Sequence, residues 1–139
     1  RFAIGIGDIT TDIVLEHSSE IDGPAYHRAR KVMEEIKNKK KQYTEPYSNI
    51  MICSEEDNFE IDRLLNSILS VCTALKSKWT DRQIEIIHAY LTNGENQYKA
   101  AATLGIGQSS VNKALNNAKF YSYQSAMDTI NSFLNKKHH

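Results

Sequence analysis

The run QYKAAATLGIGQSSVNKALN, from Gln97 to Asn116, constrains the fold more than any other part of the chain. Ala101 stands where two helices joined by a short turn would pass closest, and only a small side chain fits there. Gly105 falls where such a turn needs a positive φ, which costs glycine little. The apolar wedge between the two helices would consist of Leu104, Ile106, Val111 and Leu115. This spacing predicts a helix-turn-helix.

The second helix of the pair would carry the residues that meet a ligand. If it enters the major groove of duplex DNA, its outward side chains can hydrogen-bond base edges or phosphates, and these are Gln108, Ser109, Asn112, Lys113 and Asn116. Lys99 and Lys119 would steer the phosphate backbone. We therefore expect a DNA-reading helix from Gln108 to Lys119. The same pattern also occurs in all-α domains that touch no nucleic acid, so a protein-protein contact is the alternative use of the motif.

Charge limits how strongly a single copy of this motif could hold DNA. The chain has 17 Lys and Arg against 17 Asp and Glu, a balance that argues against a protein that coats polyanions. From Trp79 to the end there are six basic and four acidic residues. Phosphate neutralisation supplies most non-specific affinity, so we expect weak binding by one copy and a homodimer on double-stranded DNA.

The first half of the chain alternates between strand and helix patterns. Apolar residues at every second position predict a strand from Phe2 that continues towards Leu15, and Gly5 and Gly7 suggest either a bulge or a close approach to another backbone. The elements that follow are a helix from Pro24 to about Asn38, a strand within residues 49–54, and a helix from Phe59 to Lys78.

Start signals for further helices appear in the second half. Thr80 and Gln83 have the spacing of a capping box, and Trp79 with Ile84 that of the hydrophobic staple. Ser122 can cap the last helix. The inward face of the helix that starts at Thr80 would be Ile84, Ile87 and Leu91.

These patterns predict an α+β protein with two domains. Residues 1–78 would form a strand-helix-strand-helix piece that ends in a long linking helix, and residues 79–139 an all-α, tri-helical helix-turn-helix domain with a supporting C-terminal helix. Because the chain begins inside a strand, we expect the first domain to be only part of an α+β fold.

No reaction can be assigned to the first half from its residues. Asp8 and Asp12 share one face of the predicted strand and could hold a divalent ion, or they could be two solvated carboxylates. The Gly5-Ile6-Gly7 stretch lacks the further residues of a phosphate loop. We therefore predict no catalytic residue, no metal site and no cofactor. No secretory signal or membrane-length apolar run is present, and we expect a cytoplasmic protein without membrane contact.

Two motifs near the start resemble a known family. RFAIGIGDITTDI, followed by IDGPAYHRAR, is similar to the second half of SatD-type bacterial proteins. The matching residues are Gly5, Gly7, Ile9 and Thr11 in the strand, and Asp22, Gly23, Pro24, Ala25, Tyr26, Ala29 and Arg30 at the helix. The resemblance covers essentially the whole chain, and it implies a cytoplasmic, DNA-binding regulatory protein.

The same strand and helix are also distantly similar to the closing part of nucleotidyl-cyclase-like palm domains. In such domains the metal-binding aspartates lie further upstream, so no catalytic residue is carried over. This likeness leaves a second hypothesis, in which a nucleotide-binding or cyclase-like palm domain is incomplete here. Asp8 or Arg30 would then line its cleft, and the helix-turn-helix would contact another protein.

Overall fold

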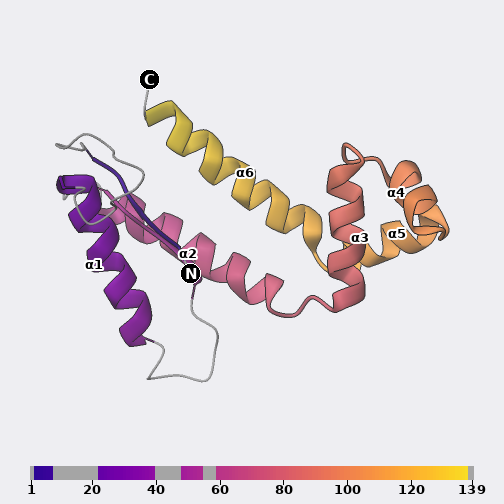
Figure 1. Ribbon diagram of the computed structural model, residues 1–139, viewed down its shortest axis with the longest axis horizontal. Coiled ribbons are helices and arrows are strands. Elements are labelled where there is room, and N and C mark those ends of the chain that lie inside the picture. Colours follow the sequence, from indigo (N-terminus) through magenta and orange to yellow (C-terminus); the bar gives the residue numbers. More distant parts are fainter. Residues whose placement is uncertain (1, 8–21, 40–47, 55–58, 138–139) are drawn as a thin grey trace. The chain divides into compact units, whose positions relative to one another are not determined.

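The computed structural model describes residues 2–7, 22–39, 48–54 and 59–137 (Figure 1). Within these residues the chain forms six helices and a two-stranded parallel sheet, which confirms the α+β class. Contacts divide the chain into two compact units, Arg1–Ala74 and Leu75–His139. The continuation of the first strand towards Leu15, including Asp8 and Asp12, lies outside the described residues.

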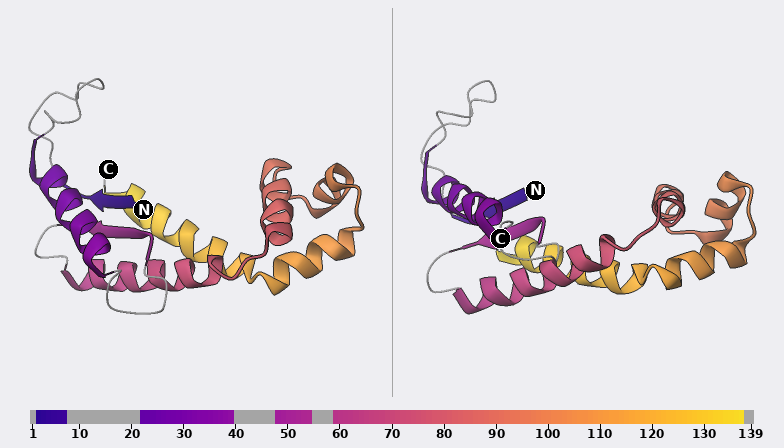
Figure 2. Two further views of the ribbon diagram at one scale, coloured as in Figure 1. Left: turned by 60° about the horizontal axis from the view of Figure 1, so that its bottom comes forward. Right: turned by 90° about the horizontal axis from the view of Figure 1, so that it is seen from below.

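The first unit is built on a strand-helix-strand crossover. β1 (Phe2–Gly5) and β2 (Ile50–Cys53) pair in parallel, with Phe2 opposite Ile50 and Gly5 opposite Cys53. The helix between them, α1 (Pro24–Lys39), packs on the sheet (Figure 2). Its apolar stripe faces inward, and the buried members are Ala25, Val32 and Ile36.

Of the two alternatives for the glycines, the close approach of backbones occurs at Gly5. A Cβ atom there would collide with the carbonyl oxygen of Ala25 and lie 2.8 Å from the backbone nitrogen of Ala29. Only glycine therefore lets α1 lie this close to β1. Arg28 adds a polar tie, because its Nη1 donates a hydrogen bond of 2.6 Å to the carbonyl oxygen of Ile6.

The outer edge of β2 is satisfied by side chains of α2 (Phe59–Lys76). Asn66 accepts from the backbone nitrogen of Ile52 and donates to its carbonyl oxygen, both at 2.8 Å. The carboxylate of Asp62 accepts from the backbone nitrogen and the hydroxyl of Ser54, both at 2.6 Å. An open strand edge would leave these groups unpaired, so α2 takes the place of a third strand.

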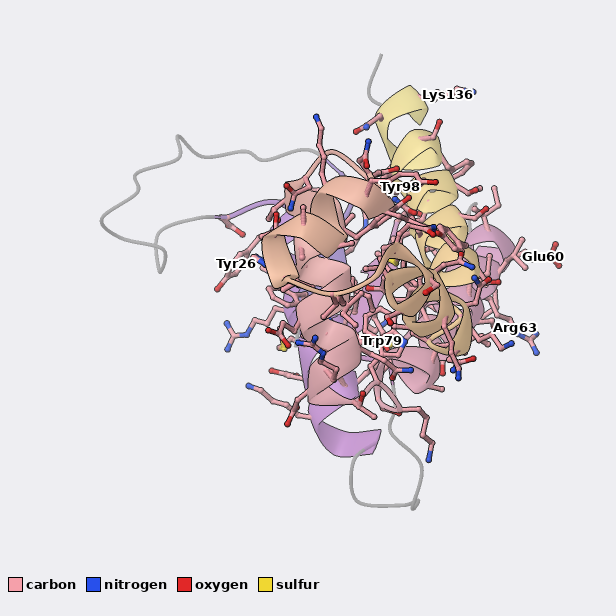
Figure 3. The ribbon with its side chains drawn as sticks, turned by 90° about the vertical axis from the view of Figure 1, so that its right-hand side faces the viewer. Tyr26, Glu60, Arg63, Trp79, Tyr98 and Lys136 are labelled. Carbon is pink, nitrogen blue, oxygen red and sulfur yellow. The ribbon has the colours of Figure 1, made fainter. Side chains whose placement is uncertain are left out.

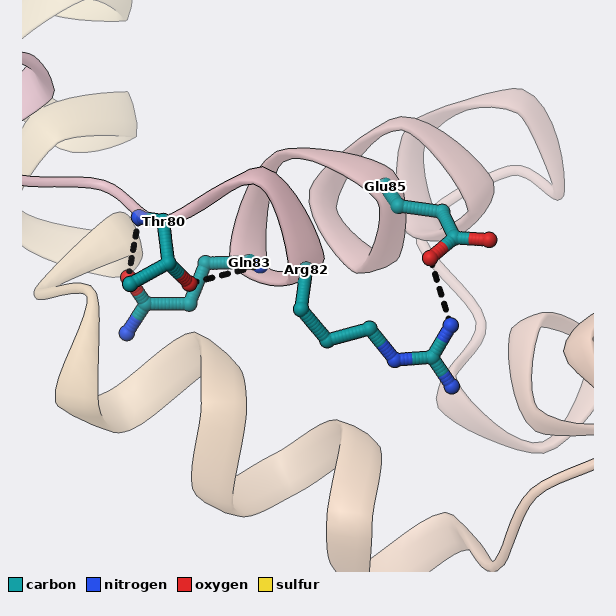
Figure 4. A network of polar contacts seen from close by, with 4 residues as sticks. All are labelled: Thr80, Arg82, Gln83 and Glu85. Carbon is teal, nitrogen blue, oxygen red and sulfur yellow. Dashed lines mark hydrogen bonds and ion pairs between the residues drawn. The ribbon is translucent and has the colours of Figure 1, made fainter.

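The second unit contains α3 (Asp81–Thr92), α4 (Gln97–Leu104), α5 (Gln108–Asn117) and α6 (Phe120–Lys137). The predicted capping box at the start of α3 is present (Figure 4). The Thr80 hydroxyl accepts from the Gln83 nitrogen at 3.2 Å, and the Gln83 side chain accepts from the Thr80 nitrogen at 2.9 Å. Helices α3, α4 and α5 pack around one core, whose least exposed members are Ala100, Val111 and Leu115.

Two expectations for the second unit are wrong. Ile87 is buried as predicted, but Ile84 and Leu91 are 47% and 46% exposed, because α3 turns Ile86 and Tyr90 inward instead. The last helix begins at Phe120, two residues before the predicted cap at Ser122. Phe120 is buried among the rings of Trp79, Tyr90 and Tyr123, and this cluster sets the start of α6.

Candidate nucleic-acid interface

The turn between α4 and α5 has the geometry that the sequence predicts. Gly105 lies in the left-handed region, with φ 65° and ψ 33°, and ends α4. Its backbone nitrogen donates to the carbonyl oxygen of Ala102, and that of Ile106 donates to Ala101. Ala101 is 4% exposed at the crossing of the helices. Residues 105–107 alone therefore connect α4 to α5.

Helix α5 is divided into an apolar face and a polar face. Val111 and Leu115 are fully buried against α3 and α4 and fix the rotation of the helix about its axis. With these two residues inside, Ser109, Asn112, Lys113 and Asn116 are exposed, and Gln108 is half-buried at the start of the helix. The five predicted contact residues on α5 are thus all at least partly accessible to solvent.

The two predicted steering lysines lie off α5. Lys99 is exposed in the first turn of α4. Lys119 is also exposed, but α5 ends at Asn117, and Lys119 occupies the turn before α6 with φ 53°. The predicted reading helix from Gln108 to Lys119 is therefore too long by two residues. The interval between α5 and the early start of α6 is too short for another helical turn.

A network of side-chain amides crosses the polar surface and involves two residues that sequence reasoning missed. Gln97, the first residue of α4, donates through Nε2 to the Tyr121 hydroxyl at 2.6 Å and to Asn112 Oδ1 at 3.3 Å. Its Oε1 accepts from Gln108 Nε2 at 2.6 Å. Gln97 lies within the helix-turn-helix run, but its partners depend on tertiary packing. No signal in the sequence points to Tyr121, since its position follows from where α6 begins.

Asn116 was predicted to contact DNA, but its amide group is hydrogen-bonded within α5. Its Nδ2 donates to the carbonyl oxygen of Asn112 at 2.8 Å and to Asn112 Oδ1 at 3.0 Å. Both amide hydrogens are therefore used within α5. Only the side-chain oxygen of Asn116 is left to meet a ligand, and an oxygen acceptor does not bind phosphate.

The charged residues in the sequence around α5 have one sign. From residue 96 to residue 127 the sequence contains no Asp or Glu, and its charged side chains are Lys99, Lys113 and Lys119. Glu95 precedes this stretch, where its Oε1 accepts from Gln124 at 2.8 Å. Burial, followed by the nearby Tyr121 and Glu95, raises the pKa of the Tyr90 phenol that lies behind the network. Residues 96–127 are therefore neutral or cationic, whereas Glu95 and Asp128 line a cavity together with Tyr121 of the network.

Tyr98 is a further exposed group beside Lys99. Its side chain is 74% exposed on α4 (Figure 3). The backbone nitrogens of Tyr98 and Lys99 both donate to the Asn96 side chain at 3.0 Å, so the start of α4 is capped. This end of α4 presents an aromatic ring and an ammonium group next to the polar face of α5.

The described part of the first unit contains an ion pair and a cavity but no cluster of metal ligands. Arg30 pairs with Glu34 at 3.8 Å on the surface of α1. A separate cavity of about 450 Å³ between α1, β2 and α2 has Lys31, Glu35 and Arg63 in its lining.

In the described part of the chain, no group of three or more His, Cys, Asp or Glu side chains is placed to hold a metal ion. None of the helices described there has the length and apolar character needed to cross a membrane.

Comparison with known proteins gives one match. The model of the SatD family matches residues 1–133, and so extends over both units. No curated protein and no solved structure matches the chain.

Proposed function

The chain belongs to the SatD family, and on that basis we propose that it is a regulatory protein whose α5 binds the major groove of duplex DNA. The observation that supports the proposal most is the outward face of α5. Ser109, Asn112 and Lys113 are exposed on α5, and Gln108 is half-buried at its start, beyond a helix-turn-helix turn and within a stretch that has no acidic residue. Such a face offers hydrogen-bonding groups to bases and no charge that repels phosphate.

The dimensions of α5 suit this role. Its ten residues give a helix about 15 Å long, at about 1.5 Å per residue. The major groove is about 12 Å wide, so it admits a helix of this kind over several base pairs. Because Val111 and Leu115 hold the opposite face, α5 can enter the groove without exposing the core.

Affinity should depend on a second copy. Three lysines near α5 could neutralise about three phosphates, and each phosphate contributes about 0.9 to the slope of log K against log salt. A slope of this size corresponds to weak binding at physiological salt. A homodimer would double the contacts and would bind two half-sites about 34 Å apart.

The test is a comparison of two lysine variants of the full chain on duplex DNA, with fluorescence anisotropy measured over a range of salt. Lys113→Ala removes a cation from the exposed face of α5, and we expect weaker binding and a salt slope reduced by about one. Lys136→Ala makes the same charge change near the far end of α6 and serves as the matched control. Equal effects of the two substitutions would contradict binding through α5.

The alternative function has a distinct outcome in the same experiment. If wild-type protein shows no salt-dependent binding to duplex DNA, the helix-turn-helix is better explained as a protein contact surface. Titration with nucleotide and magnesium then tests the cavity of the first unit, where Lys31→Ala is the variant of choice because Lys31 lies in its lining.

A further inference from the structure

We propose that Gln108 reads an adenine in the bound duplex, and that Gln97 is the positioning residue that holds it for this purpose. The inference rests on the proposed function, because it needs α5 to lie in the major groove. It goes further by naming one base and the two side chains that select it. The contact that suggests it is the 2.6 Å hydrogen bond from Gln108 Nε2 to Gln97 Oε1.

The hydrogen-bonding groups left on Gln108 match adenine. A glutamine amide has two N–H donors and one oxygen with two lone pairs. One N–H of Gln108 is used on Gln97, so one N–H and the whole of Oε1 are left without a partner among the described residues. In the major groove, adenine presents the N7 acceptor beside the N6 amino donor, and a glutamine side chain pairs with both at once.

Gln97 cannot read a base itself in this arrangement. Both of its N–H groups are directed at Tyr121 and Asn112, and its Oε1 accepts from Gln108. Its partners are Gln108 and Asn112 on α5 and Tyr121 on α6, so Gln97 on α4 is the centre of the network. Because Gln97 already holds the Gln108 side chain, less rotamer freedom is lost on binding DNA. This should raise the affinity by about 2- to 12-fold relative to a mobile side chain.

Asn112 differs from Gln108 in the groups it has left. Its Oδ1 accepts from both Gln97 and Asn116, so both lone pairs are engaged, and its Nδ2 donors have no partner among the described residues. A donor-only amide suits acceptors such as guanine O6 and N7 or a phosphate oxygen. The adenine contact therefore belongs to Gln108 rather than to Asn112.

The experiment selects binding sites with the full chain from a pool of duplexes with a randomised core. We expect one adenine in each half-site, and weaker binding when it is replaced by 7-deazaadenine, which lacks N7, or by purine, which lacks the N6 amino group. Gln108→Met keeps the length of the side chain and should lower the preference for adenine by about 5- to 150-fold. Gln97→Met should lower affinity for the selected site by about 2- to 12-fold and broaden the base preference. Ser110→Ala, exposed on the same helix, is the control.

The outcomes separate this inference from the function on which it rests. Duplex binding whose base preference is the same in wild type and Gln108→Met overturns the assignment of adenine while DNA binding stands. A preference lost in Gln108→Met but unchanged in Gln97→Met overturns the positioning role. Absence of any duplex binding by the wild type overturns the proposed function itself. Equal thermal midpoints of all variants exclude misfolding as the cause.

Discussion

Gly105→Ala tests whether the helix-turn-helix turn depends on backbone conformation alone. Gly105 has φ 65°, and a Cβ atom there would meet none of the described atoms within 4 Å, so no steric clash with neighbours contributes. An L-residue in the left-handed region costs about 1–2 kcal/mol. Alanine also lowers the conformational entropy of the unfolded chain, which stabilises the folded state by about 0.4–1 kcal/mol. The free energy of unfolding should therefore fall by about 1 kcal/mol. For a unit of this size, that lowers the thermal unfolding midpoint by about 4–8 °C.

Trp79 is the only tryptophan, and it packs against Phe120 and Tyr123, so its fluorescence reports unfolding of the second unit. Gly107→Ala is the matched control, because Gly107 has φ −74° and an added Cβ would lie 3.6 Å from Ser109 Oγ, an ordinary contact. Gly107→Ala should change the free energy of unfolding by no more than about 0.5 kcal/mol, since the poorer helix cap offsets the lower entropy of the unfolded chain. Equal losses for the two alanine variants would refute the reasoning.

Three further perturbations follow from individual contacts. Asn66→Leu leaves the backbone N–H and C=O of Ile52 unpaired at the edge of the sheet, and should cost about 1–3 kcal/mol in urea unfolding followed by circular dichroism. Trp79→Phe removes the 2.8 Å hydrogen bond from the indole N–H to the Ala118 carbonyl but keeps an aromatic ring, so calorimetry should show a loss of about 1 kcal/mol. Burial raises the pKa of the Cys72 thiol above its ordinary 9.0, so its contribution to stability is complete below pH 9.0 and is lost as the pH rises through the higher folded-state pKa. Unfolding at a series of alkaline pH values checks this, with Cys72→Ala as the variant that should lack the effect.

Local chemistry made the helix boundaries of the second unit largely predictable. The Thr80–Gln83 capping box and the positive φ of Gly105 are properties of a few neighbouring residues, and both occur as expected. The buried face of α3 was predicted only for Ile87, because Ile84, Ile86 and Ile87 offer two apolar faces of similar strength. Packing against the neighbouring helices decides between them, and periodicity alone cannot.

The candidate interface shows the same division between local and tertiary information. The outward placement of Asn112 and Lys113 follows from the burial of Val111 immediately before them, which the sequence indicates. The link between Gln97 and Tyr121 joins two residues that are 24 positions apart, and it depends on where α6 starts. Asn66, which closes the edge of β2, likewise looks like any polar residue on a helix until the strand lies beside it.

The most direct test of α5 as a DNA-binding helix is a gel-shift titration of the double variant Asn112→Ala, Lys113→Ala against wild type on the same duplex. Both side chains are exposed, so the fold should be retained, and circular dichroism verifies this. Each base-reading contact contributes about 1–3 kcal/mol, so the account predicts a loss of affinity of at least about 5-fold. Unchanged affinity of a folded double variant would contradict the central claim.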